Sequence, residues 1–238
     1  MGSALGAALL AAGHEVLWAS AGRGAETAER ARAFSDVGDA ATLAQRADVI
    51  LSVCPPHAAQ EVLRSVAGFD GVYVDANAIS PATARTLAKE MPAFVDGGII
   101  GPPPLASATT RLYLSGPEAA GVARLFDGTA VDARLLSTEI GDASALKMTY
   151  AAWSKGSAAL LLAIRAVARA EGVEDRLLAE WTLSAPGLQA RVERAERSAE
   201  AKGWRWVGEM EEIAATFGAA GQPEGFHRAA AEVFRGFS

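Results

Sequence analysis

The sequence predicts a parallel α/β domain followed by an all-helical domain. Short apolar runs rich in β-branched residues alternate with helical segments up to about residue 135, which is typical of βαβ units and a mainly parallel sheet. After residue 139 no strand is indicated, and residues 142–171 contain a single helix breaker, Gly156. We therefore expect a sheet domain over residues 1–138 and a helical domain over residues 139–238.

The sheet domain is predicted to alternate helices with short strands. Strands are expected at residues 15–19, 48–53, 71–75, 93–96 and 111–115, and helices at residues 2–12, 25–34, 40–46, 58–66 and 80–90. The segment 48–53 is largely apolar and rich in β-branched residues, as expected of a strand buried on both faces. Ser80 followed by Pro81 predicts a helix start, because serine caps the first turn and proline fits within it.

The second half is predicted to be helical throughout. One long helix is expected over residues 142–171, where the domains join. Turns containing Gly or Pro separate four further predicted helices, at residues 174–184, 187–202, 207–219 and 224–236.

Composition restricts the classes of partner. The net charge of −6 argues against nucleic acid or an anionic membrane surface as the main partner, because both select basic patches. Cys54 is the single cysteine, which predicts a reducing, cytoplasmic setting without an intramolecular disulfide. The apolar stretch 2–12 is too short for a membrane span and lacks the basic start of a signal peptide. The three histidines and Cys54 have no metal-ligand spacing, so no metal site is expected.

Five segments occur in an order shared with one enzyme family. They are MGSALGAALLAAGHEV at 1–16, DVILSVCPP at 48–56, DANAISP at 75–81, DGGIIGP at 96–102 and GDASALK at 141–147. In turn they resemble the end of the phosphate-binding fingerprint, the Pro-containing turn beside the nicotinamide ribose, the D-x-S-T-I-S-P segment, the D-A-P-V-S-G-G substrate loop and the G-x-G-x-x-x-K catalytic motif of β-hydroxyacid dehydrogenases. That family includes 3-hydroxyisobutyrate and 6-phosphogluconate dehydrogenases. The resemblance spans about residues 1–170, and the C-terminal part is similar to a 6-phosphogluconate-dehydrogenase-like branch with a distinctive helical domain.

The resemblance implies a Rossmann-type NAD(P)-binding domain, hydride transfer to or from a small hydroxy acid, and a homodimer formed through the helical domains. The family's first strand and two phosphate-loop glycines would precede Met1, so we expect this chain to be N-terminally shortened. The alternative function is a non-catalytic truncated pseudoenzyme or dimerising scaffold that retains the fold. The cofactor-binding residues implied are Gly2, Ser3, Ser20, Arg23, Cys54, Pro55 and Asn77.

The end of the second strand bears on cofactor choice. NAD sites place a carboxylate there for the ribose 2′-hydroxyl, whereas NADP sites place arginine and hydroxyl groups for the 2′-phosphate. The segment Ser20–Arg23 has no acidic residue before Glu26, and Arg23 can hold phosphate with its planar fork. NADP is therefore predicted, with NAD as the alternative cofactor. The alternative for Arg23 is that it only faces solvent, as most loop arginines do.

Lys147 is the predicted catalytic residue. Hydride transfer to a carbonyl requires a group that exchanges the hydroxyl proton, and a desolvated lysine can do this. Tyr150 and Ser154 share its helical face. The alternative is a surface lysine that extends from an apolar helix. The predicted substrate-binding residues are Asn77, Gly101, Tyr150 and Ser154, and the alternative for Asn77 is a structural role in a helix-entry turn.

Two departures from the family pattern affect the predicted substrate. The family usually has asparagine four residues after the lysine, where this chain has Ala151. Ile100 and Pro102 replace the serine and the last glycine of the substrate loop, which leaves loop 97–104 apolar. Carboxylate recognition is therefore open, and a less polar carbonyl or an imine is an alternative substrate.

Overall fold

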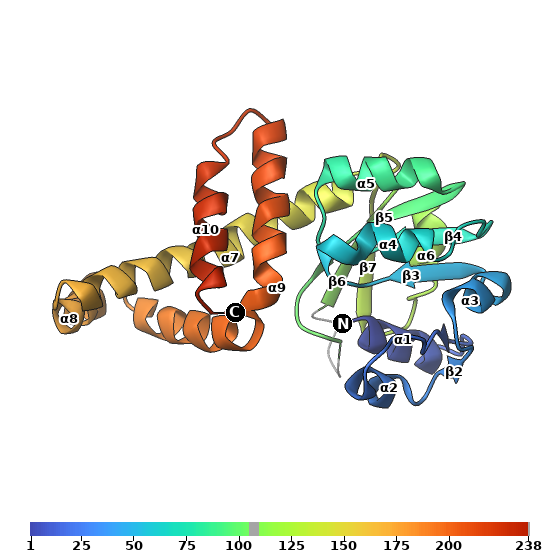
Figure 1. Ribbon diagram of the computed structural model, residues 1–238, viewed down its shortest axis with the longest axis horizontal. Coiled ribbons are helices and arrows are strands. Elements are labelled where there is room, and N and C mark those ends of the chain that lie inside the picture. Colours follow the sequence, from blue (N-terminus) through green and yellow to red (C-terminus); the bar gives the residue numbers. More distant parts are fainter. Residues whose placement is uncertain (105–109, 238) are drawn as a thin grey trace. The chain divides into compact units, whose positions relative to one another are not determined.

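The computed structural model describes residues 1–104 and 110–237, which form two compact units, residues 1–147 and 148–238. Figure 1 labels the helices and strands of both units. The first unit contains all the strands within the described residues, and the second is helical. The predicted fold class, a Rossmann-like sheet domain followed by a helical region, is confirmed.

Two sheets occur in the first unit. The larger sheet has the strand order β3-β4-β5-β6-β7, and all its neighbours are parallel except β5 and β6. Its strands are β3 (Val49–Ser52), β4 (Val72–Asp75), β5 (Ala93–Ile100), β6 (Thr110–Ser115) and β7 (Val131–Ser137). The smaller sheet pairs β1 (Leu17–Trp18) in parallel with β2 (Ser35–Asp36).

Helices connect the strands of the first unit. They are α1 (Gly2–Ala11), α2 (Ala25–Ala31), α3 (Ala40–Arg46), α4 (Ala59–Arg64), α5 (Pro81–Leu87) and α6 (Ala119–Arg124), with 3₁₀ turns at Pro56–Ala58 and Ala88–Glu90. The predicted helix start at Ser80 is confirmed, because its hydroxyl accepts the Thr83 N–H at 3.2 Å. The side chain of Asp39 caps α3 in the same way.

Apolar side chains cover both faces of the larger sheet, as expected for parallel strands. On one face, Leu5 of α1 and Val122 of α6 pack with Val95 of β5. On the other face, Leu63 of α4 and Leu87 of α5 belong to a second buried cluster. Figure 1 shows this helix–sheet–helix arrangement.

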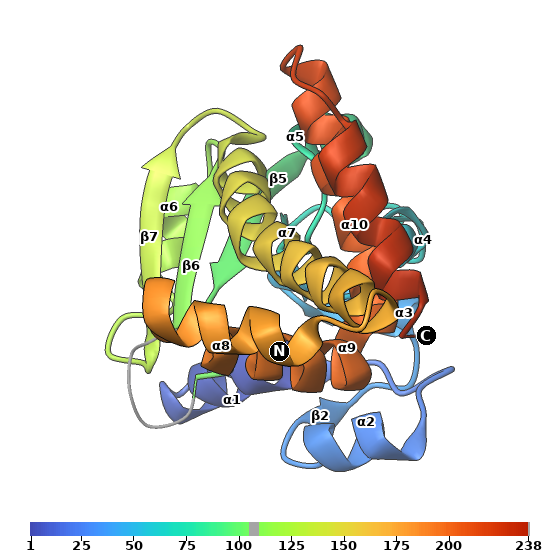
Figure 2. The ribbon, with the colours of Figure 1, turned by 90° about the vertical axis from the view of Figure 1, so that its left-hand side faces the viewer.

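The second unit consists of the long helix α7 (Asp142–Ala170), which starts in the first unit, together with α8 (Glu174–Ser184), α9 (Leu188–Ala219) and α10 (Gly225–Arg235). Helices α9 and α10 lie side by side in Figure 1, and Figure 2 shows the same pair with α10 in front. The ring of Phe217 is 4.3 Å from that of His227. Within the described part of the chain, no helix combines the length and apolar character that crossing a membrane requires.

The structure corrects two local predictions. The two helices predicted at 187–202 and 207–219 are one helix, α9, and Gly203 does not break it. A Cβ at Gly203 would lie 3.1 Å from the Cβ of Phe237, so the glycine permits close packing inside the helical unit. The predicted loop 97–104 begins later, because residues 97–100 extend β5 and pair with β6. The sequence did not indicate β2, α6 or β7.

Candidate functional site

Lys147 lies in the second turn of α7 and is partly buried against β5. Its Nζ donates a hydrogen bond to the carbonyl oxygen of Ile99 at 2.7 Å. Gly98 allows the helix to approach this closely, because a Cβ there would lie 2.7 Å from the Ala143 oxygen and 3.2 Å from the Lys147 Cβ. The lysine amine is therefore held at the carboxyl end of β5, where Rossmann-type sheets bind ligands.

The buried carboxylate of Asp96 anchors the start of α7. One oxygen, Oδ2, accepts the N–H groups of Gly141 and Ser144 at 3.0 and 2.9 Å, and the Ser115 hydroxyl at 3.2 Å. The other oxygen accepts the Ser144 hydroxyl at 2.6 Å. These bonds satisfy amides that a helix start leaves unpaired, and the negative charge favours that end of the helix. Burial raises the pKa of Asp96, and the hydrogen bonds from Ser144 oppose this shift.

A second buried network joins the carboxyl ends of β3 and β4. The side-chain amide of Asn77 donates to Ser52 Oγ at 3.1 Å and to Asp75 Oδ2 at 2.9 Å. Its carbonyl oxygen accepts the Cys54 N–H, and its own backbone N–H donates to Asp75 Oδ1 at 3.0 Å. Asn77 is 3% exposed, and these bonds fix the turn that begins at Cys54.

Asp75 belongs to the same network and is fully buried. Burial raises the pKa of this carboxyl group to about 7, although the backbone and side-chain amides of Asn77 oppose the shift. Both Asp75 and Asp96 occupy paired positions of neighbouring strands, so two acidic groups lie at one end of the sheet.

Three of the predicted cofactor segments lie in the same unit. Gly2 begins α1 next to β3, and a Cβ on it would lie 3.3 Å from the Cβ of Val53. Arg23 is exposed, and its backbone N–H donates to the Ser20 oxygen at 3.0 Å in a turn after β1. Burial raises the pKa of the Cys54 thiol, and the charge of Arg23 opposes this shift. The Ser20–Arg23 turn is thus within electrostatic range of Cys54.

Asp36 is a residue that the sequence analysis missed. It ends β2 beside β1, and its carboxylate accepts the Gly38 N–H at 2.9 Å. This bond, and then the hydroxyl of Ser20, lower the pKa of Asp36. The Asp-x-Gly sequence indicates a turn, but only the pairing of β1 with β2 places the carboxylate beside Ser20.

The remaining predicted residues lie as follows. Ser3 is in the first turn of α1, and Pro55 is in the turn after β3. Gly101 is exposed with φ of +116°, a conformation that favours glycine. In the second unit, Tyr150 is 45% exposed, and the Ser154 hydroxyl bonds the Ala151 oxygen of its own helix at 3.5 Å. Within residues 1–104 and 110–237, no group of three His, Cys, Asp or Glu side chains is placed to hold a metal ion.

Two family models match parts of the chain. Residues 1–79 match "NADP oxidoreductase coenzyme F420-dependent", and residues 168–237 match a domain of unknown function, DUF1932. A curated relative, an uncharacterized 28.5 kDa protein from Methanothermus fervidus, is 30% identical over 139 residues. That alignment covers 57% of this chain and 54% of the relative, so the chain matches about half of the relative's length.

Solved structures have the same fold. A conserved protein of unknown function, described as similar to 3-hydroxyacid dehydrogenases, is 27% identical with a TM-score of 0.68, over 99% of this chain and 92% of that one. The 3-hydroxyisobutyrate dehydrogenase of Mycobacterium tuberculosis, solved with L-serine, is 17% identical with a TM-score of 0.70, over 100% and 90%. An imine reductase from Myxococcus stipitatus, solved with NADP+, is 21% identical with a TM-score of 0.59, over 99% and 90%.

The two family models fall on the two halves of the chain, and the fold and the order of the motifs agree with them. In its fold, in the order of its motifs and in these two partial matches, the chain is similar to β-hydroxyacid dehydrogenase-like proteins.

Proposed function

We propose that the protein is an NADP-dependent oxidoreductase acting on a small hydroxy acid or a related carbonyl or imine. The observation that carries this proposal is the position of the Lys147 amine, held 2.7 Å from the Ile99 oxygen at the carboxyl end of β5. The bound nicotinamide cofactor would supply or accept the hydride. The relatives solved with NADP+ and the match to an NADP oxidoreductase model support this reaction class.

The residues present fit a dinucleotide. The ten-residue helix α1 begins at Gly2 without a side-chain cap, so its first amides and positive dipole end suit a phosphate group. Ser3 would contact the same phosphate, and Cys54 and Pro55 would contact the nicotinamide ribose. Asn77 would support that contact by fixing the turn at Cys54. Arg23 would bind the 2′-phosphate of NADP. Asp36, bonded to Ser20, favours NAD as the alternative cofactor.

Lys147 would exchange the substrate proton. When the hydroxyl is oxidised, the neutral amine accepts its proton, and when the carbonyl is reduced, the ammonium donates the proton and stabilises the developing oxyanion. Its partner Ile99 is a carbonyl, which accepts a hydrogen bond from either form of the amine. A substrate oxygen could replace this partner without leaving a buried charge unpaired.

The proposed oligomer is a homodimer formed through the helical unit. Trp153, Leu160, Ile164 and Val167 lie on one face of α7 and are between 37% and 65% exposed. Their spacing of seven, four and three residues places them along one side of the helix as an apolar stripe. A stripe of this kind marks an interaction surface.

Tyr150 and Ser154 are proposed to contact substrate from α7, and Gly101 from the loop after β5.

Direct cofactor binding tests this proposal. NADPH and NADH would be titrated into the full chain by calorimetry, followed by assays with hydroxy acids, ketones and imines at 340 nm. We expect NADPH to bind more tightly than NADH. Arg23→Ala should weaken the binding of NADPH more than the binding of NADH. Asp36→Asn, at the end of the neighbouring strand β2, is the matched variant. Equal losses for the two cofactors would argue against a 2′-phosphate contact. Binding of neither cofactor would favour the non-catalytic scaffold.

A further inference from the structure

Arg111 lies on β6 beside the lysine site. The strand alternates its side chains between the two faces of the sheet. Leu112 and Leu114 belong to the core cluster with α1 and α6, so Arg111 and Ser115 face the other side. The Ser115 hydroxyl accepts the Ala143 N–H at 3.0 Å. Arg111 therefore occupies the face that the start of α7 covers.

The strand register brings Arg111 close to Lys147. Arg111 pairs with Ile100 of β5, and the neighbouring Ile99 carbonyl holds the Lys147 amine. Directly paired residues of antiparallel strands have Cβ atoms about 4.5–5.5 Å apart. Arg111 and the Lys147 amine thus lie at the same end of β5, within the first unit.

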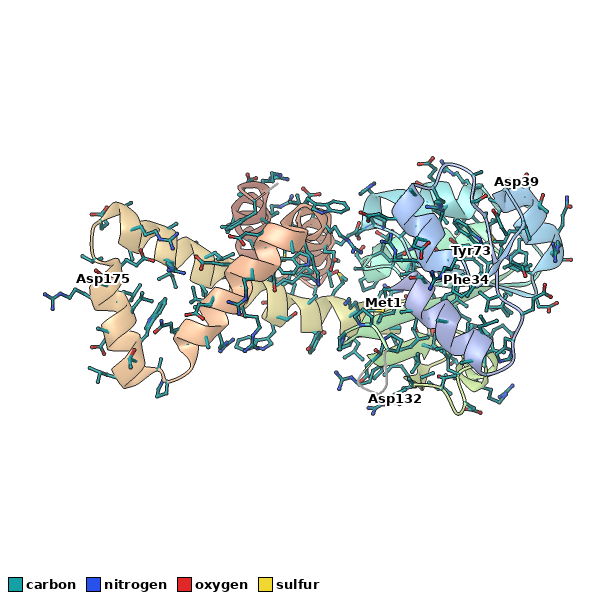
Figure 3. All side chains as sticks on the ribbon, turned by 90° about the horizontal axis from the view of Figure 1, so that it is seen from below. Met1, Phe34, Asp39, Tyr73, Asp132 and Asp175 are labelled. Carbon is teal, nitrogen blue, oxygen red and sulfur yellow. The ribbon has the colours of Figure 1, made fainter. Side chains whose placement is uncertain are left out.

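The guanidinium of Arg111 is only partly satisfied. Its Nε is buried, and among the described residues it has no hydrogen-bond partner. Asp132 of β7 pairs with Arg111 of β6, and it is labelled in Figure 3. The Asp132 carboxylate accepts a hydrogen bond from Arg134 Nε at 2.9 Å, which is the main cause that lowers its pKa, and the charge of Arg111 lowers this pKa further. A buried N–H donor without a hydrogen-bond partner destabilises the folded state.

We infer that Arg111 binds the carboxylate of the substrate, which makes the ligand class small carboxylic acids with a hydroxyl or carbonyl group nearby. The planar guanidinium would bind the two carboxylate oxygens through parallel N–H bonds. The Lys147 amine, next to it on β5, would then contact the hydroxyl or carbonyl oxygen. This inference rests on the proposed function for the reaction, but its binding step does not depend on hydride transfer.

A carboxylate ligand for Arg111 favours an acid substrate over the less polar carbonyl or imine that the apolar loop leaves open. Ile100 and Pro102 remove hydroxyl and backbone flexibility from the segment that leaves β5, and they offer no side-chain donor. Arg111, on the paired strand, supplies a charged donor at the same edge. Recognition of the acid would therefore come from the strand after the loop.

Binding of paired charged and uncharged ligands tests this inference. Acetate, 3-hydroxypropanoate and 3-hydroxybutanoate, each with its methyl ester, would be titrated into the full chain by NMR, with and without NADP+. We expect each acid to bind at least about 10-fold more tightly than its ester, because a charge-assisted pair contributes about 10- to 100-fold in affinity. Arg111→Gln should abolish the preference, and Arg111→Lys, which keeps the charge but not the fork, should retain a part of it.

Arg124→Gln is the matched control, because it removes an exposed arginine from α6 in the same unit. This variant should keep the preference for acids. Thermal melts followed by circular dichroism would establish that each variant is folded. The inference is overturned if no acid binds better than its ester, or if folded Arg111→Gln keeps the preference. NADPH binding is measured separately, so a protein that binds acids but no cofactor would contradict the proposed function and leave this inference standing.

Discussion

Asp75 is a buried acid whose protonation is linked to folding. Its carboxyl group is fully enclosed, and burial raises its pKa from an ordinary value near 4 to about 7. The folded state therefore binds a proton more tightly than the unfolded state does. The stability from this proton is fully present below the unfolded pKa and is lost as the pH rises through the folded pKa.

This linkage predicts a stability difference between pH 5 and pH 8. Wild-type protein should lose about 2–3 kcal/mol of unfolding free energy from this group over that range. Asp75→Asn should reduce the pH dependence, because an amide does not titrate. Urea denaturation at the two pH values measures the effect, with the exposed Asp70→Asn as the control. An unchanged pH dependence in Asp75→Asn would contradict the assigned linkage.

Sequence alone predicted Lys147 as the catalytic residue but did not indicate the residues that position it. The spacing of Gly141 to Lys147 matched a catalytic motif, whereas Asp96, Ser115 and Ser144 carry no local signal of a shared network. Their contacts join two strands to a helix start, and such contacts depend on tertiary structure. Asp36 was missed for the same reason, because strand pairing places it beside Ser20.

The close packing of α7 on β5 determines where the lysine amine lies. Gly98 is the residue that permits it, since a Cβ there would lie 2.7 Å from the Ala143 oxygen. A distance below 3.0 Å to backbone requires the helix or the strand to move. The position of Lys147 is therefore sensitive to a single methyl group.

Gly98→Ala should destabilise the protein by about 1–3 kcal/mol through this overpacking. Gly208→Ala is the control, because nothing lies within 4 Å of a Cβ there and alanine favours a helix interior. The control should be neutral or stabilising by about 0.5–1 kcal/mol. Chemical denaturation of both variants would decide, and equal stability of Gly98→Ala and wild type would contradict the packing argument.

Long elements with a regular pattern were predicted well from sequence. The bounds of α7 and α8 match the expected segments closely because no strong breaker interrupts them. The sequence analysis predicted a helix end at Gly203, although α9 continues through it. In the sequence, a glycine that permits close helix packing cannot be distinguished from a glycine in a turn. Strand β7 was also missed, because its Val131–Ser137 segment mixes charged and apolar residues.

The apolar stripe on α7 predicts that two copies of the chain associate. Replacing Leu160 and Val167, each 62% exposed, by glutamate should convert the proposed homodimer to a monomer. Substitutions at such exposed positions leave the fold of one chain nearly unchanged. Light scattering after size-exclusion chromatography measures the mass, with exposed Gln222→Glu as the control. Wild-type protein that elutes with the mass of a single chain would contradict the dimer.

The two-part architecture followed from the order of strands and helices, because βαβ crossovers imply a parallel sheet. The sequence motifs also indicated the family. Neither source named the substrate, since specificity depends on side chains that the fold brings together, such as Arg111 and the end of β5. Substrate choice is therefore a property of the folded unit and not of a linear motif.

Turnover of a lysine variant shows whether the Lys147 amine takes part in proton exchange. With a substrate found by the assay at 340 nm, Lys147→Ala should lower kcat by about 100-fold or more. Its affinity for NADPH should not change, and the exposed Lys89→Ala should behave as wild type. Undiminished turnover in folded Lys147→Ala would contradict a role of the Lys147 amine in proton exchange.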